Sequence, residues 1–309
     1  SAGGQMMVRG DLVIDMKSLD KICEIGDDFI TIEGGVAWSE ILEAAVERNL
    51  TPPVVTDWLS VSIGGTVSMG GFGFMSFHRG TQMDHLVELE VVTGTGEKIT
   101  CSPTINSEIF DAVRATHGQF AIITKAKIPL EPAPKSVRMV QAAYGSVTDL
   151  LDDINRLSKN HEVDLIHGFA AEKTPQSVMT RMNSTDSMNL DLHVVVSALN
   201  DVGGNWVYNL EISDLQGHGL KGPRVDLSQL NHLPGCIDVW EISWKEFCFR
   251  LPPLIIEEQL QGAAPHPEIT VFVPFNEEGI DLMNAEFDRI HPIEDIGGGP
   301  VLFFPLNSK

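Results

Sequence analysis

The alternation of apolar and polar positions predicts four strands in the first third of the chain. DLVIDM at 11–16 and ITIEGG at 30–35 are short apolar runs, and the second ends in a glycine turn. LVELEVVT at 86–93 alternates apolar and acidic residues, and GTG at 94–96 can turn the chain back into KITCS. This last pair is expected to form a hairpin with one solvated face.

Helical spacing of apolar residues predicts two helices in the same part of the chain. The first carries an apolar stripe from Ile41 to Val46 and leaves its glutamates on the outer face. The second begins at Asn106 or Ser107, both of which are favourable caps, and runs to about His117.

A boundary between two domains is expected near residue 130. The strand-like run at 120–130 is followed by EPAPK at 131–135, which has two prolines and no apolar period and is therefore typical of a linker. We expect one domain over residues 1–130 and a second over residues 131–309.

The second domain mixes the two kinds of pattern. Runs at 190–199 and 268–274 have the composition of strands, whereas 147–158 and 276–290 have the period of helices. This mixture predicts an α+β domain with a largely antiparallel sheet.

Composition and charge exclude several classes of function. The 43 acidic and 21 basic residues give a net charge of -22, which disfavours nucleic acid and anionic membranes as partners. The four cysteines lie far apart, without the spacing of a metal site, so we expect no metal. The apolar runs are shorter than a membrane span, and we expect a soluble protein, secreted or cytoplasmic.

Residues 56–80 are the densest unusual stretch, with many glycines among small hydroxyl residues. Glycine backbone and the hydroxyls of Ser62, Thr66 and Ser68 could hold a pyrophosphate. Neither GxGxxG between a strand and a helix nor GxxxxGK[ST] occurs, so a common Rossmann or P-loop site is excluded. The alternative is a glycine-rich loop packed under a neighbouring strand.

Several segments resemble the cytokinin dehydrogenases, which are FAD-dependent oxidoreductases of the vanillyl-alcohol-oxidase type. The run at 56–80 with TDWL and IGGTVSMGG, and ELEVVTGTGEKITCS at 88–102, resemble the flavin-binding half of that family. GQFAIITKAKIPLEPAP at 118–134 resembles the strand and linker that close this half. APHPEITVFVP at 264–274 and GGGPVLFFPLN at 297–307 resemble landmarks of the substrate domain, in the same order.

The resemblance implies a two-domain flavoprotein. Residues 1–130 would form a PCMH-type FAD-binding domain that is incomplete at its N-terminus, and residues 131–309 would form the cytokinin-binding-like substrate domain. SAGGQ resembles the end of a GHSxxGQ loop, which implies that a His immediately before Ser1, outside this sequence, carries the flavin covalently. The chain is therefore interpreted as an internal fragment.

The resemblance, taken with the glycine-rich backbone, also indicates the residues that contact the cofactor. They are Ser1, Gln5, Thr56, Asp57, Ser62, Gly64, Gly65, Thr66, Ser68, Phe72, Gly118 and Ile122. GGFGFMSFHRG departs from the family's usual sequence, and ATHGQFAIIT replaces a more glycine-rich run with His117 and Ala121 as substitutions.

Asp57 matches the family's catalytic aspartate. A secondary amine gives a hydride to flavin only if its N–H proton also departs, so a carboxylate within hydrogen-bond reach would act as general base. The alternative is an aspartate that only shapes a turn after two prolines.

The expected reaction is oxidation of a secondary amine, an adenine derivative, to an imine that water hydrolyses. Oxygen or a quinone would accept the electrons. Two rivals stay open: a related flavin oxidase acting on an alcohol, sugar or secondary metabolite, and a catalytically silent module that keeps the flavin fold.

Overall fold

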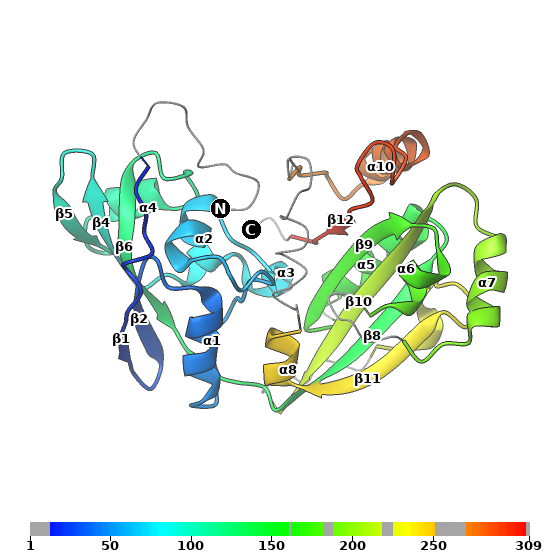
Figure 1. Cartoon of the computed structure of the whole chain (residues 1–309), viewed down its shortest axis with the longest axis horizontal. Helices are drawn as coiled ribbons and strands as arrows, with labels where there is room; N and C mark the ends of the chain where they lie inside the picture. Colours follow the sequence, from blue (N-terminus) through cyan, green and yellow to red (C-terminus); the bar gives the residue numbers. More distant parts are fainter. Residues whose placement is uncertain are drawn as a thin grey trace. The chain divides into compact units, whose positions relative to one another are not determined.

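The computed structural model describes residues 13–73, 75–160, 162–181, 188–217, 225–250 and 270–306. Their chain forms two compact units, one ending at Ala133 and the other beginning at Pro134. Each unit is built around its own five-stranded sheet (Figure 1). The predicted α+β class and the largely antiparallel sheet are confirmed.

The first unit has a sheet in the order β1-β2-β6-β4-β5, with every pair antiparallel. Its strands and helices are β1 (Ile22–Ile25), β2 (Phe29–Glu33), α1 (Trp38–Val46), β3 (Leu50–Thr51), α2 (Ile63–Met69), α3 (Ser76–Arg79), η2 (Gln82–His85), β4 (Glu88–Thr93), β5 (Lys98–Cys101), α4 (Ser107–Val113), β6 (Ala121–Pro129) and β7 (Glu131–Pro132).

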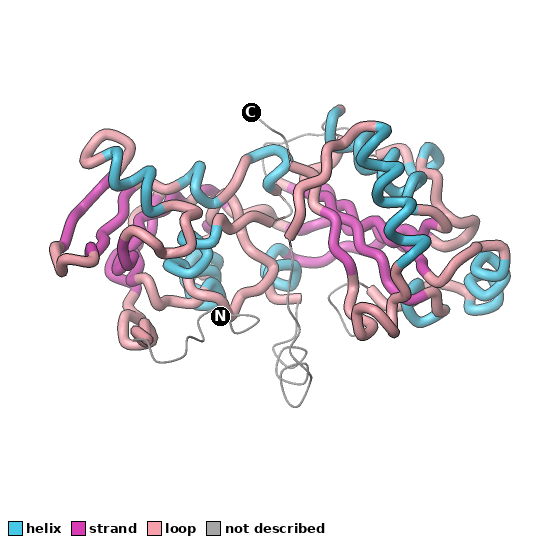
Figure 2. The backbone as a smooth tube through the Cα atoms, turned by 90° about the horizontal axis from the view of Figure 1, so that it is seen from above, coloured by secondary structure: helices cyan, strands magenta, loops and turns pink. Residues whose placement is uncertain are grey.

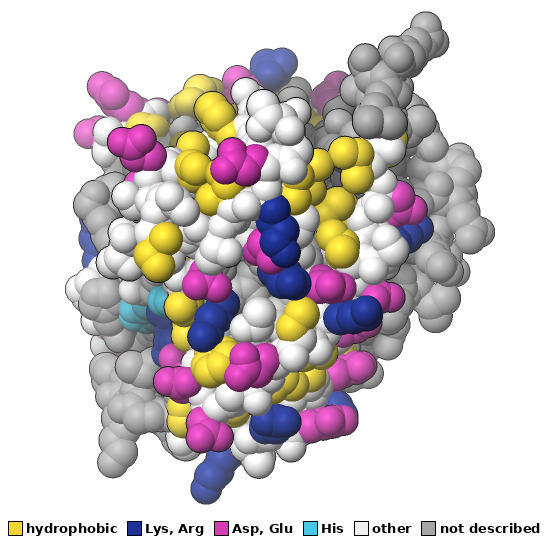
Figure 3. Space-filling model, turned by 90° about the vertical axis from the view of Figure 1, so that its left-hand side faces the viewer, with side chains coloured by type: hydrophobic (Ala, Val, Ile, Leu, Met, Phe, Trp, Pro, Cys, Tyr) yellow, Lys and Arg dark blue, Asp and Glu magenta, His cyan; other side chains and the backbone are white. Residues whose placement is uncertain are grey.

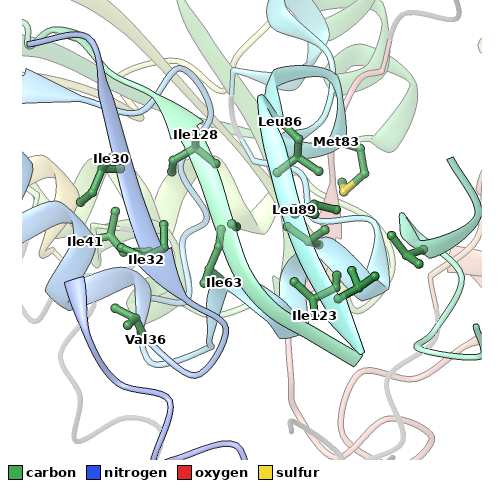
Figure 4. Packing of buried hydrophobic residues seen from close by; sticks show 14 of the residues in the cluster. Ile30, Ile32, Val36, Ile41, Ile63, Met83, Leu86, Leu89, Ile123 and Ile128 are labelled. Atoms are coloured by element: carbon green, nitrogen blue, oxygen red, sulfur yellow. The ribbon is translucent and has the colours of Figure 1, made fainter. Parts of the chain in front are cut away.

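The core of this unit lies between the sheet and its helices. Ile30 and Ile32 alternate inward on β2, while Ile41 of α1 and Ile63 of α2 are fully buried against the same cluster (Figure 4). Period-two burial on the strands and three-to-four spacing on the helices therefore converge on one apolar layer.

The predicted hairpin is confirmed, because β4 and β5 pair antiparallel from Leu89 opposite Cys101. The strand predicted at 11–16 is wrong for its described residues 13–16. Asp15 accepts a hydrogen bond from the main chain of Lys17 at 3.0 Å, and this local turn competes with extended pairing. The predicted linker begins with β7, which pairs with β3.

The second unit has the order β11-β8-β10-β9-β12, again antiparallel throughout. In Figure 2 its strands run side by side with helices flanking them. Its elements are β8 (Ser136–Tyr144), α5 (Val147–Lys159), β9 (Leu165–Glu172), α6 (Pro175–Met179), α7 (Leu192–Asn200), β10 (Trp206–Gln216), η3 (Leu227–Gln229), β11 (Ile237–Ser243), α8 (Trp244–Cys248), α10 (Glu277–Arg289) and β12 (Val301–Phe303).

Two strand predictions in this unit are wrong. Most of 190–199 is α7, which Asp191 caps by accepting from the main chain of His193 at 2.8 Å. Val195 and Leu199, four residues apart, are its buried positions, so the tertiary contact overrides the β-branched composition. Residues 270–274 of the second stretch have no strand, and the rest of it lies outside the described residues.

Candidate functional site

Helix α2 and its cap carry five of the twelve predicted cofactor contacts, and the first turn of the helix is already hydrogen-bonded within the unit. Ser62 caps it by accepting from Gly65 N at 3.3 Å. The main chain of Ile63 donates to Val36 O at 3.0 Å, and that of Gly64 donates to Gly34 O at 2.9 Å. A ligand at this helix would therefore meet its exposed side rather than an open set of N–H groups.

The glycines around α2 fall into two groups. A Cβ on Gly64 would lie 2.7 Å from Gly34 O, one on Gly71 would lie 2.4 Å from Gln82 Oε1, and one on Gly73 would lie 2.1 Å from Val55 O. These three are glycine because the chain itself packs against them. Gly65 differs, because an added Cβ would meet only Ser62 Oγ at 3.1 Å.

The segment before β6 packs on the C-terminal end of α2. Ala115 N donates to Val67 O at 2.9 Å and His117 N to Ser68 O at 2.8 Å, so the last carbonyls of the helix are satisfied from another segment. This docking explains why α4 ends at Val113 instead of reaching His117. It brings Gly118, exposed and with open space around its Cα, beside Ser68.

The same docking forces two ordinary residues into the left-handed region. Ala115 has φ 54° and His117 has φ 60°. Left-handed backbone costs an L-residue roughly 1–2 kcal/mol, and glycine avoids that cost at some entropic expense. We expect Ala115→Gly and His117→Gly each to raise the free energy of unfolding by up to about 1 kcal/mol in urea denaturation.

Ala112→Gly is the matched control, because Ala112 lies inside α4. There the same change should lower the free energy of unfolding by about 1 kcal/mol. If Ala115→Gly and His117→Gly lowered the free energy of unfolding as much as the control does, the backbone at Ala115 and His117 would not be strained.

Thr66 is tied into the core more than the other candidate contacts. Its hydroxyl accepts from Trp38 Nε1 at 2.9 Å and donates to Ile63 O at 3.3 Å. The hydroxyl keeps one acceptor position beyond these two bonds.

Asp57 and Thr56 lie half-buried in the irregular segment between β3 and α2. The close approach of Gly73 to Val55 O brings Phe72 and the turn after α2 against this segment. The turn that contains Phe72 therefore lies against Val55 and Thr56, which precede Asp57 in the chain. The other candidates, Ser62, Gly65, Ser68 and Gly118, belong to α2, its cap and the segment packed on its C-terminal end. Ile122, half-buried, follows at the start of β6. Ser1 and Gln5 lie outside the described residues.

The exposed side of α2 has the chemistry that a flavin dinucleotide requires. Gly65 and Gly118 present bare backbone, and Ser62 and Ser68 are half-exposed hydroxyl residues. Met69 is 45% exposed and Phe120 is 61% exposed, which gives apolar surface next to these polar groups. Backbone without Cβ suits a close phosphate, and apolar side chains suit an aromatic ring, so the residues present fit the group.

Sequence reasoning missed a buried polar row in the second unit. Gln141 of β8, Glu211 of β10 and His167 of β9 face one another across three strands in register, and each is at most 2% exposed. Arg250 Nη2 lies 3.9 Å and His167 Nδ1 lies 4.0 Å from Glu211 Oε1. The polar residues at every second position of β10, Asn209, Glu211 and Ser213, were the available signal.

Burial lowers the pKa of His167 well below its ordinary value, and the Arg250 guanidinium lowers it further. The folded protein therefore keeps this imidazole neutral. Below pH about 6.5 the unfolded chain takes up a proton that the folded chain does not, so stability is lost as pH falls.

We expect His167→Gln to reduce the loss of unfolding free energy between pH 7.5 and 5.5, by up to about 1.4 kcal/mol per pH unit. Urea denaturation at several pH values measures the slope. The exposed His193 supplies the control, since His193→Gln should leave the slope close to that of the parent. A His167→Gln slope equal to the parent's would contradict a neutral buried imidazole.

The described residues contain no group of three or more His, Cys, Asp or Glu side chains placed to hold a metal. In the part of the chain that the structure describes, no helix combines the length and apolarity needed to cross a bilayer. On the face shown in Figure 3, basic and acidic side chains are interspersed.

Comparisons with known proteins match both units to one kind of enzyme. Residues 1–102 match the family "FAD binding domain", and residues 134–309 match the family "Cytokinin dehydrogenase 1, FAD and cytokinin binding". The whole chain is 32% identical over 334 residues to cytokinin dehydrogenase 10 of Oryza sativa subsp. japonica. It is 30% identical over 324 residues to cytokinin dehydrogenase 1 of Arabidopsis thaliana.

Part of the chain is also similar to a bacterial protein, an uncharacterized oxidoreductase ORF5 in the fasciation locus of Rhodococcoides fascians. The two are 41% identical over 168 residues, which is 54% of this chain and 38% of that protein. The chain covers 59% of the rice relative and 55% of the Arabidopsis relative.

Proposed function

Because the chain belongs to the cytokinin dehydrogenase family, we propose that the protein is an FAD-dependent oxidoreductase that cleaves the side chain of a cytokinin. The substrate is a secondary amine joining an adenine ring to an isoprenoid carbon. Its oxidation gives an imine, and addition of water to the imine releases adenine and an aldehyde. Oxygen or a quinone then takes up the electrons.

The observation that carries the cofactor part is the exposed side of α2. Ser62, Gly65 and Ser68, with Gly118 from the docked segment, offer hydroxyls and bare backbone on one surface of the unit that matches the FAD-binding family. These residues would hold the pyrophosphate and the flavin ring of FAD. Bound there, FAD supplies the hydride acceptor of the reaction.

The role of Asp57 follows from the proton balance of amine oxidation. The C–H bond leaves with its electron pair as hydride, and the N–H proton must go to a base. Asp57 precedes α2 in a half-buried segment, where partial exclusion of water strengthens the attraction between a carboxylate and an N–H donor. We propose that this carboxylate accepts the proton.

The experiment uses the full-length gene product. Fluorescence titration with FAD tests the cofactor, and anaerobic mixing with isopentenyl adenine, other secondary amines and simple alcohols tests the substrate through bleaching of the oxidised flavin band. We expect FAD to bind and the adenine-derived amine to reduce it fastest. Reduction by alcohols alone would identify a related oxidase, and a protein with no affinity for FAD would be a silent module.

A further inference from the structure

Gln82, at the start of η2, has a buried side-chain amide that makes no hydrogen bond with the described residues. The residue is 4% exposed, and neither Oε1 nor Nε2 has a hydrogen-bond partner among the described residues. An amide left in this state destabilises the fold, because its polar groups have lost water without gaining a partner. Methionine would fill nearly the same space without that cost, so an amide at this position indicates a polar partner.

The amide lies between two segments of the candidate site. The Gln82 main chain donates to Gly71 O at 2.9 Å, and a Cβ added to Gly71 would lie 2.4 Å from Gln82 Oε1. Gln82 also lines a small void, together with Trp38, Pro52, Pro53, Val54 and His85, among others. The void has room for about one water molecule.

The void is lined mostly by apolar side chains, among them Ile63, Leu86 and Ile128, and its hydrogen-bonding groups come from a few residues. Gln82 supplies both a donor and an acceptor, and His85, whose Nε2 bonds to Arg79 O at 2.9 Å, keeps Nδ1 for another partner. Pro52 and Pro53 have no N–H, so their main chain can only accept. A buried water typically makes about three hydrogen bonds to groups such as these.

We propose that the Gln82 amide binds one internal water molecule in this void, and that Gln82 is thereby a positioning residue for the segment that carries Asp57. Pro52–Val54 leads directly into Thr56 and Asp57, and Gly73 packs on Val55 O from the other side. A water that bridges Gln82 to Pro52–Val54 would hold that segment and the turn at Gly71 in fixed positions. The positioning role rests on the proposed function of Asp57, whereas the water site does not.

The water is tested by crystal structures of the full-length protein and of its Gln82→Met variant. We expect density for a water within hydrogen-bond distance of the Gln82 amide in the parent, and its loss in Gln82→Met with the fold retained. A dry void in the parent at a resolution that shows other buried waters would overturn the proposal. This test stands even if no amine reduces the flavin, an outcome that would instead overturn the proposed function.

The positioning role is tested by the rate of anaerobic flavin reduction relative to the parent across pH. Misplacement of a catalytic group by about 1 Å can cost about a hundredfold, so we expect Gln82→Met to be roughly ten- to a hundredfold slower at every pH. Gln82→Glu should reduce the flavin as fast as the parent at pH values where the buried carboxyl is protonated. At higher pH, where the carboxyl ionises, the rate of flavin reduction should fall. The affinity for FAD should change less than about threefold in both.

Gln229→Met is the matched control, because Gln229 is exposed in the other unit. It should leave the rate and the pH profile as in the parent. If Gln82 only fills space, Gln82→Met will reduce as fast as the parent and the Glu variant will show no pH dependence of its own. That result would overturn the positioning role.

Discussion

Asp57→Asn should slow substrate-driven reduction of the flavin by about 10²–10⁴-fold while FAD stays bound. Asparagine keeps the volume and part of the hydrogen bonding of aspartate but cannot accept the N–H proton of the amine. The measurement is single-turnover reduction under anaerobic conditions with isopentenyl adenine, followed at the oxidised flavin band.

Asp27→Asn controls for the loss of one carboxylate from the same unit, because Asp27 is exposed in the turn between β1 and β2. It should leave the rate unchanged. If Asp57→Asn is reduced as fast as the parent by every substrate that the parent accepts, Asp57 is only a turn residue and the base lies elsewhere.

Gly73→Ala should mainly lower the stability of the protein, whereas Gly65→Ala should mainly weaken FAD binding. A Cβ on Gly73 would lie 2.1 Å from Val55 O, a backbone atom, so the turn must move and the free energy of unfolding should fall by about 1–3 kcal/mol or more. A Cβ on Gly65 would meet only Ser62 Oγ at 3.1 Å, so stability should change by less than about 1 kcal/mol. If FAD passes over Gly65, its affinity should nevertheless fall about tenfold or more.

Denaturation of the two variants without FAD gives the stabilities, and fluorescence titration gives the affinities. Gly94→Ala is the control for Gly65→Ala, because a Cβ on Gly94 would meet nothing within 4 Å and would lie in the β4–β5 turn. A Gly65→Ala protein that binds FAD as tightly as Gly94→Ala would mean that the cofactor does not approach this part of α2.

The elements with strong periods could be predicted from the sequence. Helices α5 and α10 lie close to the predicted 147–158 and 276–290, since each has a clear polar and apolar face. The β4–β5 hairpin follows from its alternation and its glycine turn. Local composition decides such elements because no distant contact competes with it.

The errors at α7 and β1 occurred where the local composition does not decide the outcome. The valines of α7 favour a strand locally, yet the cap at Asp191 and the burial of Val195 and Leu199 make the segment helical. β1 (Ile22–Ile25) was missed because its ICEI sequence is short and half-exposed at a sheet edge. Neither the burial of Val195 and Leu199 nor the pairing of β1 can be inferred from the local sequence pattern.

In the candidate site, too, the sequence predicted one part of the structure and not another. The density of glycine near α2 was visible in the sequence, but the reason for each glycine was not. Gly64, Gly71 and Gly73 accommodate the chain itself, whereas a Cβ on Gly65 would meet only the Ser62 hydroxyl at 3.1 Å. The buried row of Gln141, Glu211 and His167 depends on the register of three strands, which pairs residues that are far apart in the sequence.

We propose that the protein uses FAD to break the bond between the adenine nitrogen and the side chain of a cytokinin. The most direct measurement is one anaerobic turnover of the full-length protein with isopentenyl adenine, with flavin bleaching and product release followed in the same sample. We expect one adenine and one side-chain aldehyde for each flavin reduced. Flavin that stays oxidised, or that bleaches without release of adenine, would contradict the account.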